Sequence, residues 1–128
     1  MIKGCEEIFS ELEGIIRKHG FIISNRNEIG DNCIIDFRHP KIKPEPPVSY
    51  FTSAVQVNKK TNVLTATIRS KVEGFKELYL DYCCERENGY CNQRCRPHVN
   101  MNENVLSVEA TFFENPLKKF DRLLEEMK

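Results

Sequence analysis

The sequence has no net charge, because nineteen lysine and arginine residues balance nineteen aspartate and glutamate residues. This balance argues against a polybasic DNA-binding protein and equally against a highly acidic mimic of nucleic acid. At 128 residues the chain predicts a single domain, residues 1–128. A chain of this length can bury about two-thirds of its unfolded surface, so it needs no disulfide or metal in order to fold.

Long apolar segments are also missing. No stretch approaches the ~18 consecutive apolar residues that a membrane-spanning helix requires. Lys3, Glu6 and Glu7 interrupt the beginning of the chain, and no signal peptide is visible. We therefore expect a soluble, cytoplasmic protein that has no membrane partner and whose thiols stay reduced.

The common catalytic motifs are absent as well. The sequence contains no glycine-rich phosphate loop, no HExxH, no GxSxG and no pair of carboxylates set apart by apolar flanks. A thiol nucleophile would need a histidine base, and His98 follows Cys95 closely. His19 and His39 are interpreted as solvated residues at the ends of a helix and a strand. A non-enzymatic protein is expected, with a thiol-dependent enzyme as an alternative.

Hydrophobic periodicity predicts an α+β fold, in which a mostly antiparallel sheet of about five strands is combined with N- and C-terminal amphipathic helices and a Cys-rich loop. The first helix is expected over residues 2–19. Gly20 ends it, and Gly14 inside it could let a neighbour approach closely. Asn115 and Pro116 predict the start of the second helix. Cys5 and Cys33 fall in predicted elements and need no role beyond packing.

The strands are expected at residues 21–23, 33–38, 48–57, 63–72 and 105–113. Turn-forming residues occupy 25–32, and residues 58–62 form a polar hairpin tip. Residues 39–47 contain four prolines and predict an extended connector. Residues 74–86 fit the spacing of a helix and of a strand, and the helix is favoured because a hairpin with the preceding strand would mismatch the apolar faces.

Four of the six cysteines lie in the segment 83–98, which we call the Cys-rich segment. Three residues separate Cys91 from Cys95 and His98 follows, within the spacing of zinc ligands. A tetrahedral zinc site is predicted from Cys84, Cys91, Cys95 and His98, with Cys83 as the substitute for Cys84. Four protein donors leave no open position, so this zinc would be structural. Free thiols and disulfides remain alternatives, because the segment lacks two CxxC pairs.

The same part of the chain is rich in arginine and tyrosine, residues that are enriched at protein-binding hot spots. The expected contact residues are Tyr82, Arg86, Tyr90, Arg94 and Arg96. They predict a small protein-binding module of the inhibitor, immunity or adaptor type, a profile common among phage and mobile-element accessory proteins. Contacts to phosphate and stacking on bases give the alternative, a zinc-stabilised nucleic-acid-binding protein. The sequence identifies neither the partner nor the oligomeric state, for which a homodimer is one option.

Overall fold

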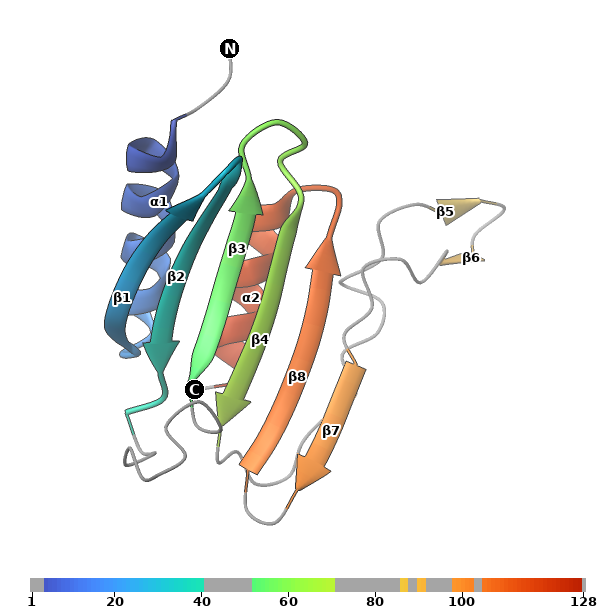
Figure 1. The fold of residues 1–128 in the computed structure, drawn as a ribbon. Helices are drawn as coiled ribbons and strands as arrows, with labels where there is room; N and C mark the ends of the chain where they lie inside the picture. The colour runs from blue at the N-terminus through green and yellow to red at the C-terminus, as the bar shows by residue number, and fades with distance from the viewer. Residues whose placement is uncertain are drawn as a thin grey trace.

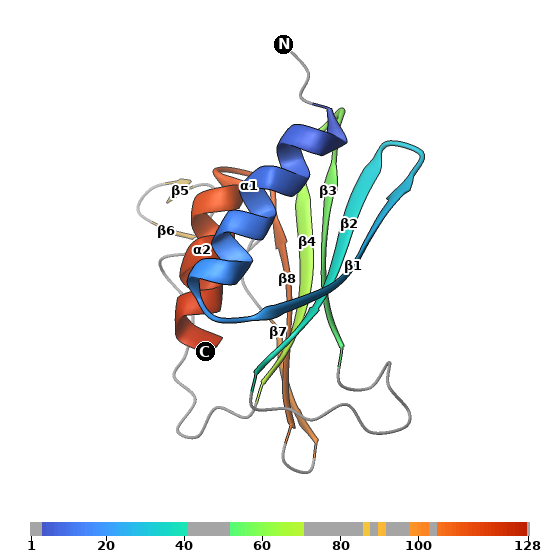
Figure 2. The same cartoon turned by 90° about the vertical axis from the view of Figure 1, so that its left-hand side faces the viewer.

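The computed structural model describes residues 4–40, 52–70, 86–87, 90–91, 98–102 and 105–127. These residues form two layers. Helices α1 (Cys5–Lys18) and α2 (Pro116–Met127) lie together on one face of an antiparallel sheet (Figure 1, Figure 2). The arrangement confirms the expected α+β class. Neither described helix combines the length and the apolar character needed to span a bilayer.

The main sheet has six strands in the order β1-β2-β3-β4-β8-β7. A second, two-stranded sheet pairs β5 with β6. The strands are β1 (Ile22–Ile29), β2 (Asn32–Arg38), β3 (Ser53–Asn58), β4 (Leu64–Ser70), β5 (Arg86–Glu87), β6 (Tyr90–Cys91), β7 (His98–Asn102) and β8 (Val105–Phe112).

Both helices form where the apolar spacing predicts them, because each has one apolar stripe to bury against the sheet. In α1 the stripe includes Ile8, Leu12 and Ile16, all buried. Acidic side chains occupy its first turn and basic ones its last, as the helix dipole favours. Gly20, with φ of 81°, lies just beyond its C-cap. Gly14 is exposed, and none of the described residues comes within 4 Å of an added Cβ, so the expected close approach of a neighbour is wrong.

The inner strands β2, β3, β4 and β8 bury alternate residues beneath the helices, as expected for a sheet with one covered face. Cys33, Ile35 and Phe37 of β2 are buried, while the residues between them remain partly exposed. Phe37 lies edge-on to Phe21 at 5.6 Å and to Phe120 at 6.2 Å between ring centroids. These aromatic contacts join three parts of the chain into one core: Phe21 just after α1, Phe37 in β2 and Phe120 in α2.

Two strand assignments differ from the sequence prediction. β1 continues to Ile29, where a turn was expected, because its residues pair one by one with β2 after a bulge between Ile23 and Asn25. Only Gly30 and Asp31 form the turn, and Gly30 has the positive φ of 58° that such a turn requires. β7 lies where no strand was predicted. Of the ambiguous residues 74–86, Arg86 is in β5, and the others lie outside the described residues.

Candidate functional site

The structure places part of the Cys-rich segment. Arg86 pairs with Cys91, and Glu87 pairs with Tyr90, in the β5–β6 sheet. This sheet lies to the side of the main sheet on which β7 is the edge strand (Figure 1). Backbone pairing therefore brings two of the expected contact residues, Arg86 and Tyr90, into one small unit. The other three, Tyr82, Arg94 and Arg96, lie outside the described residues.

The predicted zinc ligands are described only in part. Cys91 is the last residue of β6, and His98 is the first residue of β7, where its backbone pairs with Glu109 of the main sheet. The described backbone thus places two of the four donors in different sheets. Cys84, Cys95 and the substitute Cys83 lie outside the described residues, and the zinc site stays a prediction.

Cys5 and Cys33 form a disulfide between α1 and β2, with Cα atoms 5.5 Å apart. Both cysteines are buried, as expected for core residues, but the expectation of reduced thiols with a packing role alone is wrong for this pair. The bond forms because the first apolar turn of α1 packs directly over β2, which brings two cysteines 28 positions apart within bridging distance.

His19 lies in a cluster that joins the end of α1 to α2. Its Nε2 is 2.5 Å from Asp121 Oδ1, and its Nδ1 is 3.1 Å from Glu125 Oε2 without the alignment of a hydrogen bond. Lys18 donates to Asp121 at 2.6 Å. This hydrogen bond, together with the one from His19, lowers the pKa of Asp121 against the opposing effect of burial. The solvated helix end expected at His19 is therefore wrong, since the residue is buried.

His39 is likewise buried, with its ring edge-on to Phe21 at 5.2 Å between centroids. The expected solvated position is therefore wrong here too. Ser53, whose backbone pairs with Phe37 in the neighbouring strand β2, is buried and accepts a hydrogen bond from the N–H of Arg69 at 2.9 Å. Arg69 also donates from its guanidinium to the carbonyl of Thr52 at 2.6 Å. These bonds fix the junction where β3 begins beside the end of β4.

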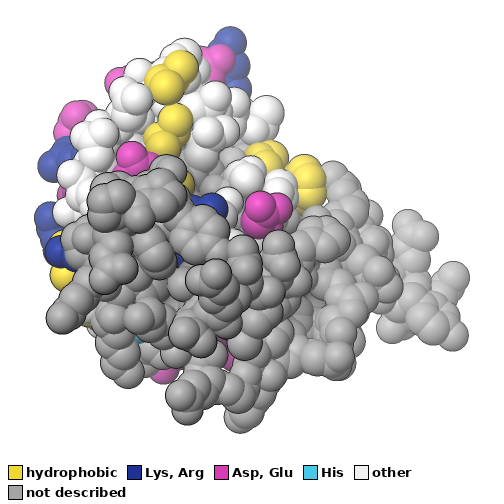
Figure 3. Space-filling view, turned by 60° about the horizontal axis from the view of Figure 1, so that its bottom comes forward, with side chains coloured by type: hydrophobic (Ala, Val, Ile, Leu, Met, Phe, Trp, Pro, Cys, Tyr) yellow, Lys and Arg dark blue, Asp and Glu magenta, His cyan; other side chains and the backbone are white. Residues whose placement is uncertain are grey.

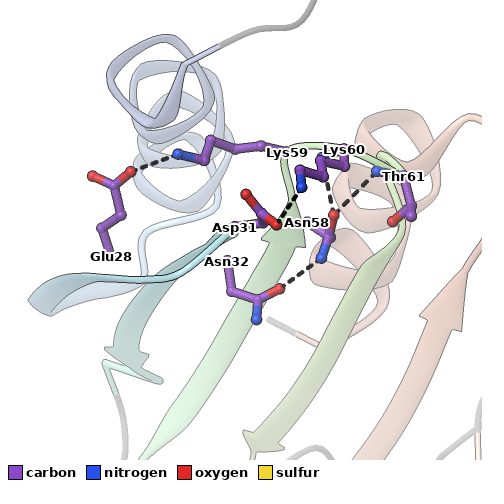
Figure 4. Close-up of polar contacts among 7 residues, drawn as sticks. All are labelled: Glu28, Asp31, Asn32, Asn58, Lys59, Lys60 and Thr61. Atoms are coloured by element: carbon purple, nitrogen blue, oxygen red, sulfur yellow. Dashed lines mark hydrogen bonds and ion pairs between the residues drawn. The ribbon is translucent and has the colours of Figure 1, made fainter.

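The polar tip expected at residues 58–62 is confirmed, and it also meets the β1–β2 turn (Figure 4). Asn58 accepts hydrogen bonds from the N–H groups of Lys60 and Thr61 and donates to Asn32. Lys59 donates to Glu28 at 2.7 Å, which raises the pKa of Lys59. The contacts satisfy the turn internally, so the tip has the features of a structural cap.

Neither protein-family models nor curated proteins nor solved structures give a match to this chain. Among the described residues, no group of three or more histidine, cysteine, aspartate or glutamate side chains is arranged to hold a metal ion. On the face drawn in Figure 3, hydrophobic side chains of the described part lie in small groups among charged and polar ones.

Proposed function

We propose that the protein is a non-enzymatic protein-binding module of the inhibitor, immunity or adaptor type. Its contact residues are Tyr82, Arg86, Tyr90, Arg94 and Arg96 of the Cys-rich segment and its border. The observation that carries the proposal is the β5–β6 sheet, which pairs the backbones around Arg86 and Tyr90 outside the main sheet. Arginine and tyrosine in such a unit supply the large planar contacts that dominate binding energy at protein interfaces.

The body of the molecule supports this proposal as a scaffold. Binding residues are often carried on irregular segments that a rigid framework positions. Here the framework is a sheet covered by two helices, fixed by the Cys5–Cys33 disulfide and by ion pairs such as Lys18–Asp121 and Arg26–Glu13. These described charges bond within the chain and stabilise it. The Cys-rich segment is the part that we propose binds a partner protein.

Affinity capture from the lysate of the native host tests the proposal. Wild type, Tyr90→Ala and Arg94→Ala would each be used as bait, with Lys118→Ala as the control, because Lys118 is exposed on α2. We expect a protein retained by wild type and by the control to be lost from both test variants. Recovery of the same protein by all four baits would contradict the assignment. A nuclease-sensitive RNA or DNA would indicate the nucleic-acid alternative.

A structural zinc bound by Cys84, Cys91, Cys95 and His98 would hold the Cys-rich segment in one conformation. The free energies support this proposal. Ordering such a segment costs on the order of 15–30 kcal/mol, and binding of a structural zinc offsets about 10–16 kcal/mol of this cost. Metal analysis of anaerobically purified protein should find close to one zinc per chain, and Cys95→Ala should lose it. A metal content below about one-third equivalent contradicts the site.

The cytoplasmic location also remains a proposal, and Cys5 provides its test. Disulfides persist mainly in oxidising compartments. Cells would be quenched in acid, which traps thiols, and the unfolded protein would then be alkylated and analysed by mass spectrometry. Alkylated Cys5 and Cys33 fit a reducing cytoplasm in which the bond forms only later. A Cys5–Cys33 disulfide already present in the cell contradicts the cytoplasmic assignment.

A further inference from the structure

The outer edge of β1 is an open strand edge. β2 pairs with one side of β1, and no other strand in the described ranges pairs with its second side. Seven of its eight residues are exposed, and Ile29 exposes 57% of its surface. β1 is the outermost strand on its side of the sheet (Figure 1). Such an edge is a template for an additional strand.

The hydrogen-bond pattern of the sheet determines which backbone N–H and C=O groups of β1 point toward its open edge. Asn58 donates its N–H to the carbonyl of Val63, which fixes the alternation of hydrogen bonds between β3 and β4. Followed through the paired residues of β3, β2 and β1, this alternation turns the backbone of Asn27 toward β2. The N–H and C=O groups of its two neighbours, Arg26 and Glu28, therefore point outward and are available to a partner strand.

Two copies of β1 can place these outward residues opposite each other in three antiparallel registers. If the two-fold axis passes at Arg26, two arginines face each other, and if it passes at Glu28, two glutamates do. Like charges directly opposite are destabilising. If the axis passes at Asn27, Arg26 of each copy faces Glu28 of the other. We propose that the protein forms a homodimer through this β1–β1 pairing centred on Asn27.

Contacts within each chain prepare this register. Arg26 Nε lies 2.9 Å from Glu13 Oε1, and its guanidinium lies over the Phe9 ring at 5.7 Å from the centroid. Glu28 Oε1 lies 2.7 Å from Lys59 Nζ. In the dimer the charges therefore alternate in sign across the seam, from Glu13 and Arg26 of one copy to Glu28 and Lys59 of the other. Side chains already held by these contacts lose less conformational freedom on association.

The regular part of the edge has a defined length. It runs from Asn25 to Ile29, between the bulge that follows Ile23 and the turn at Gly30. A short seam of this kind predicts a reversible dimer, and the added contact of Ile29 with Asn25 of the second copy covers an exposed apolar side chain. The seam lies on β1, apart from the Cys-rich segment, so dimerisation and the proposed partner binding can be tested separately.

Sedimentation velocity over a concentration series tests the dimer. Wild type should move from 14.9 kDa toward twice this mass as its concentration rises. Arg26→Glu and Glu28→Arg should each remain monomeric, whereas an equimolar mixture of the two should associate, because every facing pair then has opposite charges. Lys118→Glu should behave as wild type. A wild type that stays monomeric throughout, or variants that associate as strongly as wild type, would overturn the proposal.

Cysteine cross-linking provides a second measurement that leaves Arg26 and Glu28 intact. In the proposed register Asn27 faces its own copy in a close, non-hydrogen-bonded pair, within reach of a disulfide. Asn27→Cys should therefore form a 27–27 cross-link that peptide mass spectrometry identifies, whereas Asn25→Cys faces Ile29 and should not cross-link to itself. Equal cross-linking of the two variants, or none at residue 27, contradicts the register.

Discussion

Removal of the Cys5–Cys33 disulfide should lower the free energy of unfolding substantially. The bond joins cysteines 28 positions apart, and the chain-entropy relation gives about 12 cal/mol/K for a loop of this length, or about 3.6 kcal/mol at room temperature. Unfolding a chain of 128 residues releases about 270 cal/mol/K near its midpoint, so this loss corresponds to a fall in Tm of roughly 13 °C. The bond stabilises the fold because it restricts the unfolded chain.

The assay is denaturant unfolding followed by far-ultraviolet circular dichroism. Cys5→Ala/Cys33→Ala would be compared with wild type, each with and without a reducing agent. The difference in the free energy of unfolding between oxidised and reduced wild type isolates the contribution of the cross-link. The difference between reduced wild type and the reduced variant measures the packing lost at two buried positions. Free energies of unfolding of reduced and oxidised wild type that lie within about 1 kcal/mol of each other would contradict the expected stabilisation, provided that mass spectrometry shows the bond present in one sample and absent from the other.

Three further changes have defined outcomes. Gly14→Ala should raise the free energy of unfolding by about 0.8–1.0 kcal/mol, since the position is exposed and an added Cβ meets no atom of the described part of the chain within 4 Å; a loss of stability in thermal unfolding would contradict this. Ser53→Ala should cost about 1–3 kcal/mol, because the Arg69 N–H loses its acceptor, whereas Thr65→Ala on the open face should cost far less in the same urea titration. The pKa of Asp121 is lower in the folded protein than its ordinary value of 3.8, so the ionised carboxylate stabilises the fold. This stabilisation is complete above pH 3.8 and is lost as the pH falls through the pKa of the folded state. Below pH 3.8, the free energy of unfolding of Asp121→Asn should therefore fall less steeply with pH than that of wild type. An unchanged slope would contradict the contribution of the Lys18 and His19 contacts to stability in acid.

The helices and the central strands could be predicted because the spacing of their apolar residues follows directly from which side chains are buried. The stripe through Leu12 and Ile16 and the alternation through Ile35 and Phe37 each match one covered face. The extension of β1 through Asn25–Ile29 could not be predicted in this way, since its polar residues have low strand propensity. Tertiary contacts outweigh that preference: the segment pairs with β2, and Arg26 reaches across to Glu13 on α1.

The polar and covalent contacts were missed for a different reason. Spacing alone does not determine which cysteines pair, and Cys5 and Cys33 meet only because α1 packs over β2. His19 lies at a helix end, where solvation is the ordinary expectation, but α2 returns from the far end of the chain to place Asp121 beside it. Both contacts depend on long-range packing. The candidate contact residues and zinc ligands, in contrast, are properties of one local segment, and they remain predictions.

Site-specific photo-crosslinking from position 90 tests the central proposal most directly. A photoreactive phenylalanine analogue would replace Tyr90 in one sample and Thr65, on the open face of the sheet, in a control, and both proteins would be irradiated in the native host. We expect a discrete protein adduct from position 90 that is absent from position 65 and disappears when Arg94→Ala is added. Adducts that are the same from both positions, or that consist of nucleic acid, would contradict it.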